Sequence, residues 1–196
     1  MTLSDFEGLS DELLMKRYGE GNTAAFDLLY QRHKGPLFRF TLRQVPNRSI
    51  AEELYQDVWS KVIANRQDYH VSAKFTTWLY TIARNRVIDY FRVIGKVPDA
   101  TIIEDDVAVS DGEVQHLVCE HRPELIVESE QAAAQLKSLV KDLPPQQREA
   151  FLLKYESGFN HRDIAEITGQ KEETIKSQVR YALNKLKLGL FGGQHE

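Results

Sequence analysis

The chain has 196 residues, 42% of them hydrophobic and 28% charged, which is typical of one or two soluble globular domains. No apolar run approaches the ~20 residues of a membrane span and the first residues are acidic, so we expect neither membrane insertion nor a signal peptide. The single cysteine, Cys119, excludes a disulfide framework within the chain, and a cytoplasmic protein is expected.

The negative charge is concentrated in one segment. Residues 97–130 contain ten acidic residues and a single arginine, so this segment carries a charge of −9 within a chain whose net charge is −4. The two parts that flank this segment therefore carry a combined net charge of +5. The segment lacks sustained periodicity and contains two prolines and a glycine. We interpret residues 97–128 as an acidic flexible linker that joins two small domains, residues 1–96 and 129–196.

Both domains are predicted to be all-α, because no run alternates long enough to form a strand. Ser10 and Asn22 are expected to cap the first two helices. A third helix is expected to begin with the S-x-x-E capping box Ser49–Glu52. Burial of Leu54, Val58 and Val62 in that helix would leave one polar face exposed, formed by Glu52, Glu53, Gln56 and Asp57.

The next helix, Lys74–Arg92, reads KFTTWLYTIARNRVIDYFR and combines five aromatic residues with three arginines. Arg86 and Asp89 are three residues apart and are expected to pair. A helical wheel separates an apolar side from a polar and basic sector. The helix is therefore either a core helix with an incidental basic strip or a nucleic-acid-binding helix whose aromatic edge stacks on unpaired bases. The sector contains Thr77, Trp78, Thr81, Arg84, Asn85 and Arg92.

The second domain is expected to contain a helix near Ser129–Lys141, a segment with prolines at its start and Gly158 at its end, and two further helices. The last two, HRDIAEIT and KEETIKSQVRYALNKLK, are separated by a glycine-bearing turn, which is the helix-turn-helix pattern. The longer one is either an ordinary amphipathic helix or a recognition helix, and the preceding turn and helix favour recognition. Its polar side contains Thr174, Lys176, Ser177, Arg180, Tyr181 and Asn184.

Three motifs resemble one family. F-x-T-W-L-Y-x-I-A-R-N-x-x-I-D-Y-x-R resembles the promoter-melting segment of bacterial RNA polymerase sigma factors of the extracytoplasmic-function group. AEELYQDVWSKV resembles the polymerase-binding helix of that group, and LPPQQREAFLLKY with the following helices resembles its fourth-region helix-turn-helix. The motifs occur in the family's order, and the resemblance covers about residues 10–96 and 129–188.

The resemblance implies an alternative sigma factor, not an enzyme, that binds core RNA polymerase and promoter DNA without a cofactor. Sigma region 2 (residues 1–96) would contact the β′ clamp helices through Glu52, Glu53, Gln56 and Asp57. It would contact the minus-ten element through Arg66, Tyr69, Lys74, Thr77, Trp78, Thr81, Arg84, Asn85 and Arg92. Sigma region 4 (residues 129–196) would meet the β flap, and the minus-thirty-five element through Thr174, Lys176, Ser177, Arg180, Tyr181 and Asn184. An anti-sigma factor is an expected partner.

Two other interpretations were open. His116, Cys119 and His121 lie within six residues and have the chemistry of zinc or copper ligands, although incidental residues of a linker fit the pattern better. The other alternative is a one-component helix-turn-helix regulator with an N-terminal sensory domain, which would leave the aromatic helix and the AEEL segment unexplained.

Overall fold

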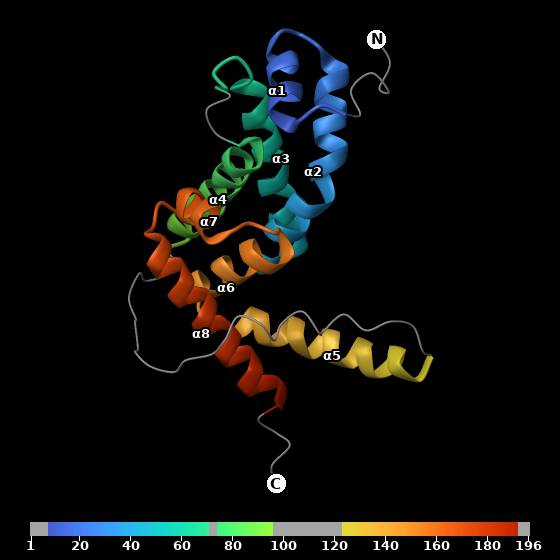
Figure 1. Ribbon diagram of the computed structural model, residues 1–196, viewed down its shortest axis with the longest axis vertical. Helices are drawn as coiled ribbons and strands as arrows, with labels where there is room; N and C mark the ends of the chain where they lie inside the picture. The colour runs from blue at the N-terminus through green and yellow to red at the C-terminus, as the bar shows by residue number, and fades with distance from the viewer. Residues whose placement is uncertain (1–7, 71–73, 96–122, 192–196) are drawn as a thin grey trace.

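The computed structural model describes residues 8–70, 74–95 and 123–191, with side chains of the last range from residue 132 to 190 (Figure 1). These residues form helices, turns and loops without a strand, which confirms the all-α prediction. None of their helices is both long and apolar enough to cross a membrane. His116, Cys119 and His121 lie outside the described residues.

The N-terminal half is a bundle of α1 (Asp11–Gly19), α2 (Thr23–Gln44), α3 (Arg48–Ala64) and α4 (Phe75–Val93). The two predicted caps are confirmed. The Ser10 side chain accepts a hydrogen bond from the Leu13 amide at 3.4 Å, and that of Asn22 accepts one from the Ala25 amide at 3.3 Å. Each cap satisfies an amide that has no partner inside its own helix.

The predicted capping box at the start of α3 is wrong. The cap is Asn47, whose side chain accepts from the Ile50 amide at 3.0 Å, and Ser49 lies inside the first turn. Glu52 does not reach back to a cap but binds Arg48 at 2.7 Å, one helical turn earlier. Asparagine caps at least as well as serine, and the Arg48–Glu52 pair adds support only if the helix begins before Ser49.

This difference predicts unequal effects of two substitutions. Asn47→Ala is expected to lower the free energy of unfolding by about 0.5–2 kcal/mol, because it removes the capping acceptor. Ser49→Ala, in the same turn, is expected to change it by less than about 0.5 kcal/mol. Urea unfolding followed by circular dichroism measures both, and a larger loss for Ser49→Ala would restore the capping box.

The C-terminal half contains α5 (Pro123–Asp142), α6 (Pro145–Phe151), a π-helical turn η3 (Leu152–Glu156), α7 (His161–Thr168) and α8 (Glu172–Phe191). Helix α5 begins six residues before residue 129, so the last part of the expected linker is helical. Pro123 stands at its first position, where proline costs no hydrogen bond.

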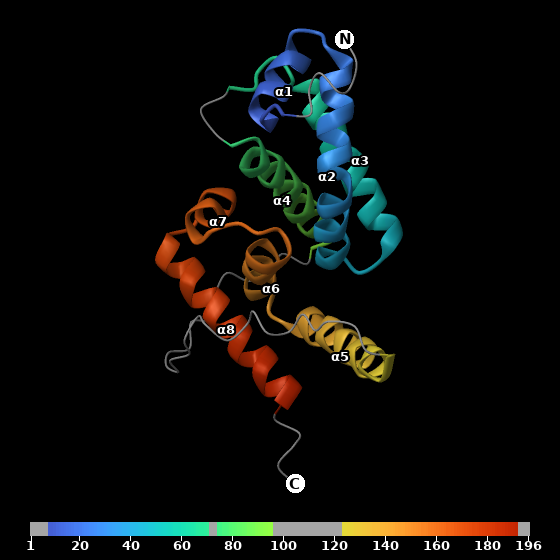
Figure 2. The same ribbon diagram turned by 45° about the vertical axis from the view of Figure 1, so that its right-hand side comes forward.

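Helices α7 and α8 confirm the helix-turn-helix. Asn160 caps α7 by accepting from the Asp163 amide at 2.8 Å. Gly169 ends α7 in the left-handed region, with φ of 67°, where a side chain would be strained. Helix α8 then runs from α7 past α6 to α5 (Figure 2).

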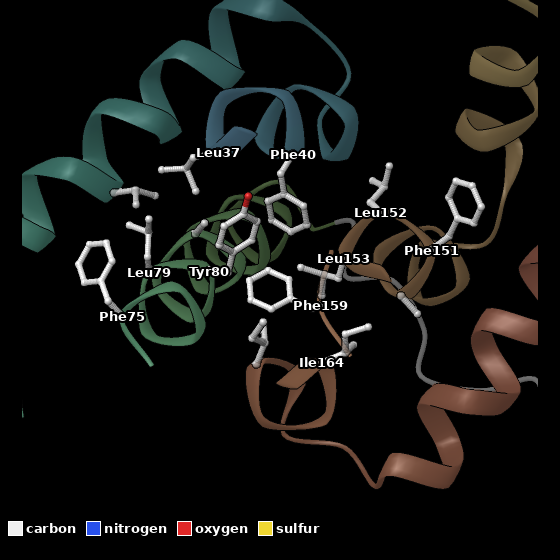
Figure 3. Packing of buried hydrophobic residues seen from close by; sticks show 14 of the residues in the cluster. Leu37, Phe40, Phe75, Leu79, Tyr80, Phe151, Leu152, Leu153, Phe159 and Ile164 are labelled. Atoms are coloured by element: carbon white, nitrogen blue, oxygen red, sulfur yellow. The ribbon is translucent and has the colours of Figure 1, made fainter. Parts of the chain in front are cut away.

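The two halves share one hydrophobic core. Phe40 of α2 packs on Tyr80 of α4 with ring centroids 5.1 Å apart, and Tyr80 packs on Phe159, which precedes α7, at 4.9 Å. Leu152, Leu153 and Ile164 continue this cluster into the C-terminal half (Figure 3). Helix α4 therefore lies between the other helices of the N-terminal bundle and α7 (Figure 2).

A charged cluster joins α1 to α2 beside this core. Asp11 binds Arg32 at 2.7 Å, and its other carboxylate oxygen lies 2.6 Å from Nε2 of His33. Burial by itself raises the pKa of Asp11, but hydrogen bonds from His33 and Arg32 outweigh burial and hold it below its ordinary value of 3.8.

Because the folded pKa of Asp11 is lowered, its stabilisation is present above pH 3.8 and is lost as the pH falls through the folded pKa. We expect Asp11→Asn to be less stable than the wild type at pH 7, with the difference shrinking as the solution is acidified below pH 4. Urea midpoints of both proteins between pH 3 and 7 measure this, and a difference independent of pH would contradict it.

Candidate nucleic-acid interface

Helix α3 has one buried and one acidic side. Leu54, Val58 and Val62 are buried in the N-terminal bundle, as predicted. The opposite side is exposed, and its polar residues are Glu52, Glu53, Gln56 and Asp57. Glu52 is the one of these whose carboxylate binds a neighbour on the same helix, Arg48. The others form an acidic surface suited to a basic partner.

Residues 65–70, which follow α3, are held against the bundle. Arg66 donates to the Ile63 carbonyl at 3.0 Å, and its guanidinium lies 6.0 Å from the Tyr18 ring centroid. The Tyr69 ring packs in a tilted arrangement against Trp78, at a centroid distance of 5.1 Å. Burial, with smaller contributions from Glu12 and Asp11, raises the pKa of Tyr69 to about 12, so its hydroxyl remains protonated at neutral pH.

The polar sector expected on α4 is only partly exposed. Asn85 and Arg92 are exposed, while Trp78, Thr81 and Arg84 are half-buried. Arg86 pairs with Asp89, as predicted. The aromatic Trp78 ring has one side against Tyr69 and Phe75.

The prediction that Thr77 belongs to the exposed polar sector is wrong. Thr77 is 2% exposed and therefore belongs to the packing surface of α4, not to a DNA-facing strip. The helical wheel assumes one covered arc, but α4 contacts α1, α2 and α3 and also α7. Two covered sides leave a narrower polar strip than the sequence predicts.

Two basic residues of the sector bind the C-terminal half. Arg84 donates to Glu149 of α6 at 3.0 Å, and the two side chains are 18% and 15% exposed. Lys74, which precedes α4, binds both carboxylate oxygens of Asp163 of α7 at 3.0 and 3.1 Å. Neither Glu149 nor Asp163 was predicted from the sequence. Their partners lie 65 and 89 residues away, so no local signal marks them.

Helix α8 presents a polar surface beside its buried stripe. Ile175, Val179, Leu183 and Leu186 are buried, as predicted. Gln178 fixes α8 on α6 by donating to Gln146 at 3.0 Å. The other side is half-buried to exposed and carries the predicted residues Thr174, Lys176, Ser177, Arg180, Tyr181 and Asn184.

Two basic groups on α8, those of Lys176 and Arg180, are held by neighbours on the same helix. Lys176 binds Glu173 at 3.0 Å and Glu172 at 3.3 Å, and these hydrogen bonds, chiefly that with Glu173, raise the pKa of Lys176. The Arg180 guanidinium lies 5.4 Å from the Tyr181 ring centroid. A hollow of about 370 Å³ beside them is also lined by His161.

The chain is similar in sequence to known proteins along most of its length. Residues 29–96 match the family described as Sigma-70 region 2, and residues 133–186 match Sigma-70, region 4. The ECF RNA polymerase sigma-E factor of Haemophilus influenzae is 27% identical over 177 residues, covering 88% of this chain and 91% of the relative. The Escherichia coli K12 sigma-E factor is 27% identical over 176 residues, covering 88% and 90%.

The chain belongs to the sigma-70 family, in its extracytoplasmic-function group. It is an alternative sigma factor that directs transcription by RNA polymerase. The resemblance stated from the three motifs is thereby confirmed, and sigma factors are transcription initiation factors.

Two solved structures have the same fold as this sigma factor. CnrH, in complex with the cytosolic domain of CnrY, superposes with a TM-score of 0.67 at 19% identity, covering 94% of this chain and 99% of that one. The sigma factor RpoE of Bartonella quintana, in complex with the anti-sigma factor NepR, superposes with a TM-score of 0.63 at 25% identity, covering 86% and 98%.

Proposed function

We propose that this sigma factor binds core RNA polymerase through the acidic side of α3. The support is the exposure of Glu53, Gln56 and Asp57 beside the buried stripe of the same helix. Exposed carboxylates complement basic clamp helices of the β′ subunit and set association rate and partner choice. Glu52 contributes less in this proposal, because Arg48 already binds its carboxylate.

Minus-ten DNA is proposed to bind along α4 and the loop before it. Asn85 and Arg92 offer exposed hydrogen-bond groups, and the half-buried Trp78 offers an aromatic ring for stacking with an unpaired base. The remaining contacts would come from Arg66, Tyr69, Lys74, Thr81 and Arg84. Stacking contributes about 1–3 kcal/mol per base, which suffices to hold open a strand where the duplex is weak.

Helix α8 is proposed to enter the major groove of the minus-thirty-five element, with region 4 seated on the β flap. Second helices of helix-turn-helix units read base edges with their N-terminal residues. In α8 these are Thr174, Lys176 and Ser177, followed by Arg180, Tyr181 and Asn184.

Arg180→Ala is expected to weaken minus-thirty-five recognition by about 1–3 kcal/mol, roughly 5- to 150-fold, because arginine is the usual bidentate ligand of guanine. Run-off transcription at a promoter that requires this element measures the loss. Lys185→Ala, an exposed base on the same helix outside the proposed set, is the matched control. Normal initiation by Arg180→Ala at such a promoter would disprove the assignment of Arg180.

One observation carries the proposal. Helix α3, whose exposed side is acidic, packs on the aromatic-rich α4. A one-component regulator needs neither feature for operator binding. Core polymerase with this chain as its single sigma factor should initiate at discrete sites on genomic DNA of the source organism. Tight, site-specific DNA binding without initiation would support the regulator instead.

The remaining assignments are narrower. RpoE of Bartonella quintana was solved with an anti-sigma factor, and we infer that a partner of this class restrains the present chain. We also propose that the chain works in the cytoplasm, where polymerase and DNA are, and has no catalytic activity of its own.

A further inference from the structure

A hollow of about 750 Å³ lies between the ends of α2 and α4 on one side and α5 and α6 on the other. Figure 2 shows α5 beneath the end of α2. No residue that lines the hollow belongs to the proposed polymerase or DNA surfaces. Small-molecule sites in proteins commonly have volumes of about 300–1,000 Å³, so the hollow has the size of a ligand site.

The lining of the hollow is strongly basic. Five cations and, among the described residues, the single carboxylate of Asp142 give it a formal net charge of +4, in a chain whose net charge is −4. A concave surface of one charge sign concentrates the electric field and attracts ligands of the opposite sign. The five cationic side chains are Arg39, Arg43, Lys137, Lys141 and Arg148.

Three of these cations lie around one carboxylate. Arg43 of α2 binds Glu156 of η3 at 2.5 Å. Burial raises the pKa of Glu156. Arg43, Arg39 and Lys137 offset that increase only in part, so all three lie near the same carboxylate. The cations outnumber the carboxylates at this place, and a ligand with several negative charges would balance the excess.

Two buried nitrogen atoms in the lining have no hydrogen-bond partner in the part of the chain that the structure describes. One is the amide nitrogen of Gln44, a residue that is 6% exposed. The other is Nε of Arg148, although another nitrogen of the same guanidinium donates to the Lys141 carbonyl at 3.0 Å. Buried donors are costly when they lack an acceptor. They indicate a ligand that brings oxygen acceptors into the hollow.

The remaining side of the hollow is aromatic and aliphatic. Tyr90 and Phe91 of α4 are half-buried there, with their rings edge to face at a centroid distance of 5.2 Å. Val45 and Val140 are buried beside them, and Ile94 is 42% exposed. Aromatic rings bind planar bases by stacking, and this contact does not depend on the identity of the base. A plain inorganic anion would leave this side of the hollow unused.

We propose that the hollow binds a nucleoside polyphosphate. Its phosphates bind Arg39, Lys137 and Lys141, because charge-assisted hydrogen bonds to phosphate are the strong ones. Its base lies against Tyr90 and Phe91. This site goes beyond the proposed function, since it uses neither the polymerase surface nor the DNA surfaces. The ligand contacts residues of both halves, so it stabilises the whole chain in proportion to its concentration and affinity.

Calorimetric titration of the full-length protein tests the proposal. ATP, GTP, CTP and UTP are titrated separately into the wild type at fixed salt. At least one should bind with a dissociation constant of about 100 µM or lower. Inorganic triphosphate has the charge but no base, and it should bind about fivefold or more weakly than that nucleotide.

A double substitution locates the site. Lys137→Gln with Lys141→Gln removes two exposed cations of the lining, so the fold should tolerate it. Nucleotide affinity should fall about tenfold or more, because two charge-assisted contacts are lost. The matched control is Lys34→Gln with Lys185→Gln, which removes two exposed lysines outside the hollow. The control should stay within about twofold of the wild type.

Hydrogen exchange of the wild type does not depend on any variant. The nucleotide should slow exchange of backbone amides at residues 42–46 and 90–94 and at the end of α5. Exchange along residues 174–184 of α8 should not change. Protection of α8 in place of these segments would put the nucleotide on the DNA-binding surface and overturn the proposal.

Other results would also overturn the proposal. They are no nucleotide binding at about 1 mM, equally tight binding of inorganic triphosphate, and equal losses in the two double variants. Poly-glutamate that binds the wild type and not the Lys137→Gln, Lys141→Gln variant, with no nucleotide binding, would assign the hollow to an acidic peptide instead. Each result is obtained without core polymerase, so a failure of this site is distinguishable from a failure of the proposed function.

Discussion

Glu53→Arg combined with Asp57→Arg is expected to lower the affinity for core RNA polymerase about 100-fold or more. Both residues are exposed on the side of α3 opposite its buried stripe, so the fold should tolerate the change. Reversal replaces attraction to a basic partner with like-charge contact, which costs several kcal/mol at an interface. Titration of core polymerase into fluorescently labelled sigma factor, at fixed salt, measures the dissociation constant.

The control for this charge reversal is Glu20→Arg with Asp27→Arg. These acids are also exposed in the N-terminal half but lie at the end of α1 and on α2. They change the net charge equally and should leave polymerase affinity within about threefold of wild type. Equal losses in both double variants would mean that net charge, and not the α3 surface, governs binding.

Phe40→Ala is expected to lower the free energy of unfolding by about 3–5 kcal/mol. Phe40 is 1% exposed and packs on Tyr80 at the centre of the core shared by the two halves (Figure 3). Because small domains are stable by about 5–15 kcal/mol in total, much of the chain would unfold near physiological temperature. Urea unfolding followed by circular dichroism gives the value.

Val93→Ala provides the comparison for Phe40→Ala. Val93 is 86% exposed at the end of α4, so its truncation should change stability by less than about 0.5 kcal/mol. A loss below 1 kcal/mol for Phe40→Ala would contradict a core that joins the two halves through this ring.

Local features of the fold could be predicted because their causes are adjacent in the sequence. The side chains of Ser10 and Asn22 accept hydrogen bonds from amides three residues later in the chain, at the start of a helix. Gly169, in the left-handed conformation, ends the helix that directly precedes it. The prediction for the start of α3 was wrong although its causes are equally local. Asn47 and Ser49 are both good caps, and only the Arg48–Glu52 pair favours Asn47 over Ser49.

The candidate interface was less predictable because its burial depends on distant residues. A wheel of α4 carries no information on what covers each side, so Thr77 was placed on the exposed strip although it is 2% exposed. Arg84 and Glu149 are 65 residues apart, and nothing local in either segment indicates the pair. The exposed surface of α3 was easier to predict, because the other helices of the N-terminal bundle cover one side of α3 and leave the opposite side exposed.

Promoter opening tests the central claim most directly. Core polymerase, this sigma factor and a promoter found by run-off transcription are mixed, and unpaired thymines are mapped with permanganate. Reactive thymines should appear at the minus-ten element with the sigma factor present, disappear without it, and weaken when Trp78 is replaced by alanine. Sigma-dependent complexes that form at the promoter but leave these thymines paired would contradict the account.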